Sequence, residues 1–127
     1  MPYRIAHDEA TGIVEVTYTG RVTKADFAAA SAAAYEFQKS HGILRFLIEI
    51  AESAEMAATK VDIYNLPSKA YAQFGLDRRT RIAMLVPGTE ALQQAAAFYE
   101  DASRNRGWNV RSFPGRSAAM AWLKQKV

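Results

Sequence analysis

The sequence contains no cysteine and only two histidines among its 127 residues. Without cysteine, a disulfide-stapled scaffold, a thiolate zinc site and a cysteine nucleophile are all excluded. The longest nearly continuous apolar segments, residues 43–50 and 82–86, are far shorter than the roughly 20 residues of a membrane-spanning helix. Residues 1–4 lead directly into strand-like sequence, without the basic and apolar segments of a signal peptide. We therefore expect a cytoplasmic protein that does not insert into a membrane.

The amino-acid composition is that of a globular domain. Hydrophobic residues make up 50% and charged residues 23% of the chain, so wholesale disorder is excluded. A chain of 127 residues has the length of one domain and can bury a core without disulfides or metals. We therefore expect a single domain over residues 1–127.

Charge is distributed unevenly along the chain. Residues 1–77 hold seven basic and ten acidic side chains, whereas residues 78–127 hold nine basic and three acidic ones. Such asymmetry can mark a basic face that binds nucleic acid or an acidic partner. The simpler interpretation, which we favour, is that the arginines cap helix ends and cover strand edges.

Hydrophobic periodicity predicts five strands. Residues 3–7 and 13–18 alternate with a period of two around a polar turn, which is the pattern of a β-hairpin. Residues 43–50 and 81–86 are apolar without alternation, as in parallel strands that are buried on both faces. Residues 108–113 alternate again and predict a half-exposed edge strand.

Helical segments separate these strands. Threonine or serine N-cap candidates precede four apolar stripes of helical spacing, and glycines follow three of the stripes. The N-cap candidates are Thr23, Thr59, Thr89 and Ser117, and the terminating glycines are Gly42, Gly75 and Gly107. Pro67 removes a backbone donor and is expected to end or kink the second helix.

The element order predicts a single α/β domain of the form β-β-α-β-α-β-α-β-α. Its sheet is five-stranded and mostly parallel, with an N-terminal antiparallel hairpin strand. If the parallel strands lie in sequential order, right-handed crossovers place their helices on one face of the sheet. Leu47 and Leu85, in the two unbroken apolar runs, should then both be fully buried.

Short segments spread over nearly the whole chain resemble a known family. They are residues 2–5, 11–14, 62–67, 81–83, 98–100, 105–108 and 121–123. Together they are similar to bacterial SpoIIAA-like proteins, in the STAS and SEC14-type group of small α/β domains. The resemblance implies the same element order and a role in regulation or binding without an enzymatic activity.

The resemblance also implies where a regulatory switch would lie. The best-understood members of the group are anti-sigma-factor antagonists, switched by phosphorylation of a serine in an Asp-Ser-Ser-Gly-like motif after the central strand. The corresponding region here is residues 50–56, which contains Ser53 but not that motif. Glu52 and Glu55 flank Ser53, and their charges would repel a phosphate. Ser53 is therefore either a phosphorylation site or an ordinary loop serine, and the repulsion favours the second.

No sequence motif indicates catalysis, and we expect no metal and no cofactor. His7 and His41 are 34 residues apart, without the spacing of metal ligands or of a nucleophile and its base. No nucleophile-elbow motif is present. The segment 87–89 lacks the lysine of a phosphate-binding loop, although a helix start there can receive an anion.

A binding site is expected where the parallel strands end. In open α/β sheets the loops that leave the carboxyl ends of the strands gather on one rim, with helix N-termini beside them. The side chains and backbone expected there are Glu52, Ser53, Gly88, Thr89, Arg116 and Ser117. This set can bind a protein partner or an anion without turnover; the alternative is three ordinary surface loops.

Three further hypotheses remain open. The SEC14 side of the resemblance implies a small apolar ligand or lipid, for which Tyr64, Leu66, Tyr71 and Phe74 are the candidate pocket unless they are plain core. Nucleic-acid binding would use the arginines of segments 78–81 and 104–106 with Trp108, but the charge is mild and no recognition motif is present. A homodimer could use the first or last strand, because bare sheet edges invite pairing.

Overall fold

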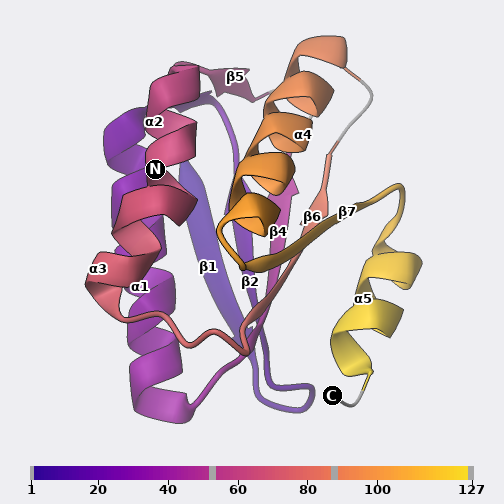
Figure 1. Ribbon diagram of the computed structural model, residues 1–127. Coiled ribbons are helices and arrows are strands. Elements are labelled where there is room, and N and C mark those ends of the chain that lie inside the picture. The colour runs from indigo at the N-terminus through magenta and orange to yellow at the C-terminus, as the bar shows by residue number, and fades with distance from the viewer. Residues whose placement is uncertain (1, 52–53, 87–88, 126–127) are drawn as a thin grey trace.

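The computed structural model describes residues 2–51, 54–86 and 89–125 and contains one central sheet (Figure 1). The strands lie in the order β1-β2-β4-β6-β7. Their bounds are Tyr3–Asp8 (β1), Ile13–Tyr18 (β2), Arg45–Ile50 (β4), Arg81–Leu85 (β6) and Asn109–Phe113 (β7). β1 pairs antiparallel with β2, and all other pairs in this sheet are parallel. The predicted α/β architecture is confirmed.

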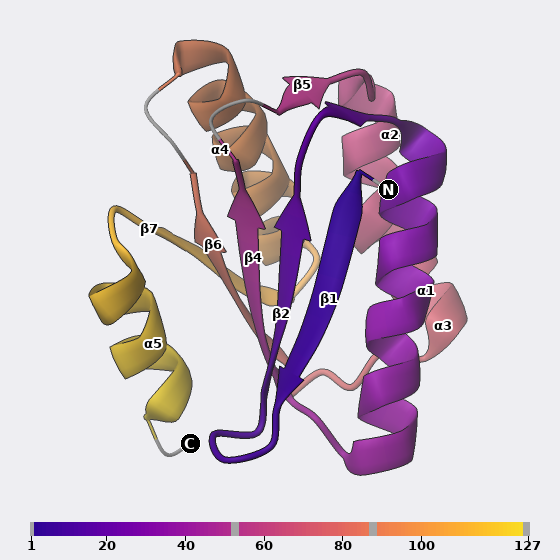
Figure 2. The same ribbon diagram turned by 180° about the vertical axis from the view of Figure 1, so that it is seen from behind.

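The helices divide unequally between the two faces of the sheet. Four helical elements and one π-helix follow the strands: α1 (Lys24–His41), α2 (Lys60–Asn65), the π-helix η1 (Leu66–Ala70), α3 (Tyr71–Phe74) and α4 (Glu90–Asn105). All of them lie on one face, hereafter the front face, because right-handed crossovers between sequentially ordered parallel strands place them there. Of the helices in the described residues, α5 (Arg116–Lys124) alone lies on the back face (Figure 2).

Two of the predicted helix starts form capping boxes. The hydroxyl of Thr23 accepts from the Asp26 amide at 3.3 Å, and the Asp26 carboxylate accepts from the Thr23 amide at 2.8 Å. Thr59 and Asp62 repeat this arrangement at the start of α2. Both pairs satisfy amides that have no partner within the helix.

The other two predicted caps require correction. Thr89 is the N-cap residue of α4, but its side chain makes no capping hydrogen bond. Ser117 lies inside α5, whose N-cap residue is the extended Gly115. The helix begins earlier than predicted because the Pro114–Gly115 turn already brings the chain into the N-cap position.

Pro67 changes the type of helix rather than ending helical structure. α2 ends at Asn65 and the chain continues through η1, in which the Tyr71 amide donates to the Leu66 carbonyl. Proline has no amide hydrogen for the regular helical ladder, and a wider turn accommodates the gap. Another element outside the prediction is a second, two-stranded parallel sheet, β3 (Arg21–Val22) with β5 (Glu55–Met56).

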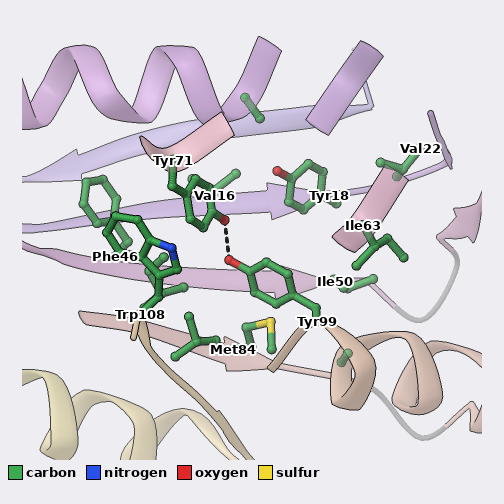
Figure 3. Packing of buried hydrophobic residues seen from close by; sticks show 14 of the residues in the cluster. Val16, Tyr18, Val22, Phe46, Ile50, Ile63, Tyr71, Met84, Tyr99 and Trp108 are labelled. Atoms are coloured by element: carbon green, nitrogen blue, oxygen red, sulfur yellow. Dashed lines mark hydrogen bonds between the residues drawn. The ribbon is translucent and has the colours of Figure 1, made fainter. Parts of the chain in front are cut away.

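The sheet separates two apolar clusters. The larger lies under the front helices and includes Val16, Phe46 and Val110 (Figure 3). The smaller lies between the sheet and α5, where Leu47 is 1% exposed, as predicted. The prediction for Leu85 is wrong: it is only partly buried, because it ends β6 at the open rim of the sheet.

Replacing Leu47 by alanine tests this assignment of the back cluster. Leu47→Ala should lower the free energy of unfolding by about 2–5 kcal/mol, because it leaves a cavity between the sheet and α5. Leu85→Ala should cost clearly less, because part of its surface is already in water. Urea denaturation of both variants measures the difference. Equal losses, or a loss below about 1 kcal/mol for Leu47→Ala, would contradict this packing.

Candidate functional site

An open hollow lies at the carboxyl ends of the parallel strands. Its volume is about 390 Å³. β4, β6 and the turn before α5 supply its lining: Glu49, Ile50, Ala51, Leu85, Val86, Pro114, Gly115 and Arg116. The hollow forms at this place because the ends of parallel strands and the start of the following helix meet at one rim. We call this surface the rim hollow.

Arg116 is held in place by an ion pair across the back face. Its Nη2 atom lies 2.7 Å from Oε2 of Glu15 on β2. The hydrogen bond to Glu15 is the main reason that the pKa of the Arg116 guanidinium is raised. Glu49 adds a smaller electrostatic contribution in the same direction. The first turn of α5 is thereby tied to the middle of the sheet.

The structure brings together only part of the predicted rim site. Glu52, Ser53 and Gly88 lie outside the described residues. Thr89 and Ser117 are exposed and do not line the rim hollow, whereas Arg116 does. The prediction missed Glu49, Leu85 and Val86, because it considered only the loops. Including the last residues of each predicted parallel strand would have found them.

The chemistry of the rim hollow is that of recognition. Its described lining offers one carboxylate, one guanidinium and an apolar floor, with no histidine, serine or threonine among them. Among the described residues, no three His, Asp or Glu side chains gather as a metal site would require. The two histidines do meet, with ring centroids 5.2 Å apart, because His7 on β1 lies under the last turn of α1.

A second candidate site lies inside the molecule, between the sheet and the front helices. Two adjacent cavities of about 50 Å³ each share Tyr18, Ser31, Ile48 and Tyr71 in their walls. Of the four residues predicted for an apolar pocket, Leu66 and Tyr71 line the first cavity, and Tyr71 and Phe74 line the second.

Tyr64 lines neither cavity. Its ring lies under the guanidinium of Arg106, 5.3 Å from the ring centroid, and its hydroxyl accepts a hydrogen bond from that guanidinium. The prediction also missed the opposite walls, such as Met84 on β6 and Tyr99 on α4. The apolar run of residues 81–86 carried the signal for Met84, and the apolar stripe of α4 carried the signal for Tyr99.

Tyrosine hydroxyls, together with the hydroxyls of Ser31 and Thr80, provide the polar side-chain groups of these cavity walls. The hydroxyls of Tyr71 and Tyr99 hydrogen bond to each other in the middle of the front cluster (Figure 3). Burial raises the pKa of Tyr99 to about 12 and raises the pKa of Tyr71 well above its ordinary value. Burial likewise raises the pKa of Tyr18, and the nearby Tyr99 adds to the effect. The cavity walls are therefore uncharged over the physiological pH range.

The arginine-rich segments serve the fold. Arg79 pairs with Asp77 at 2.8 Å, and Arg78 stacks on Trp108 with 3.8 Å between its guanidinium carbon and the ring centroid. Trp108 is only 4% exposed, so its ring is not available to stack on a nucleic-acid base. Arg81 donates to the last carbonyls of α5. These contacts agree with the interpretation that the arginines cap helices and cover edges.

The buried tyrosines predict a loss of stability in alkali. Tyr71 and Tyr99 have folded-state pKa values above the ordinary value, so their stabilising contribution is present below about pH 10 and is lost as the pH rises towards about 12. Denaturation measured across this range should show unfolding coupled to tyrosinate absorbance. The variant Tyr71→Phe/Tyr99→Phe should lose less stability over the same range. An identical alkaline profile in wild type and variant would contradict the assignment.

Comparison with known proteins identifies the family. None of the helices in the described part of the chain is long and apolar enough to cross a membrane. Searches of curated proteins and of solved structures found no match. The family model described as SpoIIAA-like matches residues 13–124, which include β2 to β7 and all the helices. With a mostly parallel sheet, an antiparallel first strand and this match over most of its length, the chain belongs to the SpoIIAA-like family.

Proposed function

We propose that this protein is a non-enzymatic regulatory domain that binds a partner protein at the rim hollow. The observation that carries the proposal is the lining of the hollow, where an apolar floor stands beside two opposite charges. A volume of about 390 Å³ lies within the range of binding pockets, and the hollow is open enough to receive a loop of another protein.

The charges of the rim hollow define the partner further. Arg116 is neutralised by Glu15, whereas Glu49 makes no ion pair among the described residues. A loop that presents an apolar side chain to Leu85 and Val86 and a lysine or arginine to Glu49 complements this surface. Ser53 follows β4 in the sequence, so its phosphorylation would add negative charge to the same region of the chain.

Crosslinking followed by a binding measurement tests the rim. A photoreactive amino acid in place of the exposed Ser117 should capture a partner in the native host, whereas one in place of Asn105, at the other end of the sheet, should not. With the captured partner purified, Glu49→Arg should weaken binding about tenfold or more, because it reverses the charge that meets the partner. Calorimetry measures both affinities.

The matched control is Asp101→Arg, which makes the same charge change on the exposed face of α4. This variant should bind the partner as the wild type does. Equal weakening by Glu49→Arg and Asp101→Arg, or equal crosslinking at both labelled positions, would show that the partner does not use the rim hollow.

The interior cavities support a second candidate function, the binding of a small apolar ligand. Their walls include the predicted Leu66, Tyr71 and Phe74, and Leu66 of η1 lines the first cavity. Short π-helical segments are frequent at functional sites. The size of the cavities limits a ligand to a few non-hydrogen atoms unless the helices move, since an engineered cavity of about 150 Å³ holds one benzene.

Native mass spectrometry of protein purified from its own host tests the second candidate. The wild type should retain a small non-protein mass, and Ala96→Val should lose it, because two added methyl groups fill the first cavity from α4. Ala97→Val, one residue further and exposed, is the matched control and should retain the mass. A wild-type mass equal to that of the chain alone would remove this candidate.

A further inference from the structure

The outer edge of β1 is unpaired among the described strands. The sheet order ends at β1, which has β2 on one side only, and α1 runs alongside it on the front face (Figure 2). Contact between the rings of His7 and Phe37, 5.5 Å apart, joins that strand to that helix. An edge of this kind presents a row of backbone donors and acceptors to solvent.

The backbone of β1 shows which groups point outward. The Thr19 amide donates to the Pro2 carbonyl at 2.7 Å, so these two residues face each other as a bonded pair. In an antiparallel ladder bonded and non-bonded pairs alternate. The amides and carbonyls of Tyr3, Ile5 and His7 therefore point away from β2, towards the free edge.

The side chains on the back face of β1 form a self-complementary pattern. Arg4, Ala6 and Asp8 are all exposed, because no helix covers the back face at this strand. A positive charge stands at one end, a negative charge at the other and a methyl group between them. When such a strand meets a second copy running in the opposite direction, each charge can face its opposite.

Only one register achieves this match. Two copies related by a two-fold axis must place outward amides opposite one another, which limits the axis to a few residues. An axis at Ala6 places Arg4 of each copy opposite Asp8 of the other, so two pairs of opposite charges form. The same axis places Ile5 opposite His7. An axis at Ile5 sets Arg4 against Ala6, and an axis at Arg4 sets two arginines together. We propose that β1 is a homodimer interface with its two-fold axis at Ala6, which joins two sheets of five strands into one.

The flank of α1 beside the edge suits this arrangement. Tyr35, on the opposite flank, faces α3 with its ring 6.0 Å from that of Phe74. By helical periodicity Ala29, Ala33, Glu36 and Ser40 lie on the flank towards the free edge. The two-fold axis brings this flank towards its copy, where three of the four side chains are small and Glu36 is exposed. The dimer thus has a polar back face and a helix-covered front face.

Charge reversal tests the interface by sedimentation at high micromolar concentration. The wild type should be a dimer. Arg4→Asp sets two carboxylates against each other in both cross-strand pairs, and Asp8→Arg sets two guanidinium groups against each other. Each variant should therefore raise the dimer dissociation constant about tenfold or more. An equimolar mixture of the two variants should form a heterodimer more readily than either variant dimerises alone, because the strands then carry opposite charges. Arg104→Asp, with the same charge change on α4, should leave the dimer intact.

Hydrogen exchange supplies a readout that does not depend on these substitutions. The amides of Ile5 and His7, which face each other across the two-fold axis, should become more protected as the wild-type concentration rises. The Asp8 carboxylate also accepts from the Ala10 amide at 3.0 Å, so Arg4→Asp carries the test if Asp8→Arg fails to fold. A monomeric wild type at high micromolar concentration, a dimer that Arg4→Asp does not weaken, or Ile5 and His7 amides whose protection is independent of concentration would each overturn the proposal.

Discussion

The sequential order of the strands is the constraint on which the rest of this structure depends. Because β2, β4, β6 and β7 follow one another across the sheet, every helix that connects them must lie on the front face. The back face then has α5 alone to cover it, and α5 reaches only one side of the sheet (Figure 2). The remaining back face is exposed to water, which is why β1 and β2 carry Arg4, Glu15 and Thr17 there.

The fastening of α5 accounts for part of the uneven charge. Arg81 donates to the carbonyls of Trp122 and Gln125 at 2.9 and 2.8 Å, which satisfies acceptors at the end of the helix. Arg116 binds Glu15 at the start of the same helix, and Arg111 lies over the Trp122 ring. A helix held by one apolar cluster thus gains contacts at both ends. Three of the seven arginines after residue 77 thus contact or fasten α5, and the other four have partners elsewhere in the fold.

Local sequence patterns predicted most of the fold. They did not predict the contacts between residues that lie far apart in the sequence. Strand alternation and the helix N-caps at Thr23 and Thr59 follow from neighbours in the sequence, and they were predicted correctly. The sequential order of the strands entered the prediction only as a condition, which the structure meets. The start of α5 was misplaced by a local signal, because the Pro114–Gly115 turn puts Gly115 rather than Ser117 at the N-cap. The ring contact of His7 with His41 and the hydrogen bond between Tyr71 and Tyr99 depend on tertiary packing. The spacing of these residues in the sequence does not predict either contact. The rim site was expected in the loops, whereas the ends of β4 and β6 line it together with the turn before α5.

The rim hollow and the free edge lie on different parts of the sheet, and this separation has a functional consequence. The hollow is built from β4, β6 and the start of α5, whereas the proposed dimer uses β1 and the flank of α1. Pairing through β1 therefore leaves the rim hollow of each copy open. An antiparallel pairing also points the carboxyl ends of the two sets of parallel strands in opposite directions. Two partner proteins could then bind one dimer without touching each other. A partner that is itself dimeric would gain avidity only if it could reach the rim hollows at both ends of the joined sheet.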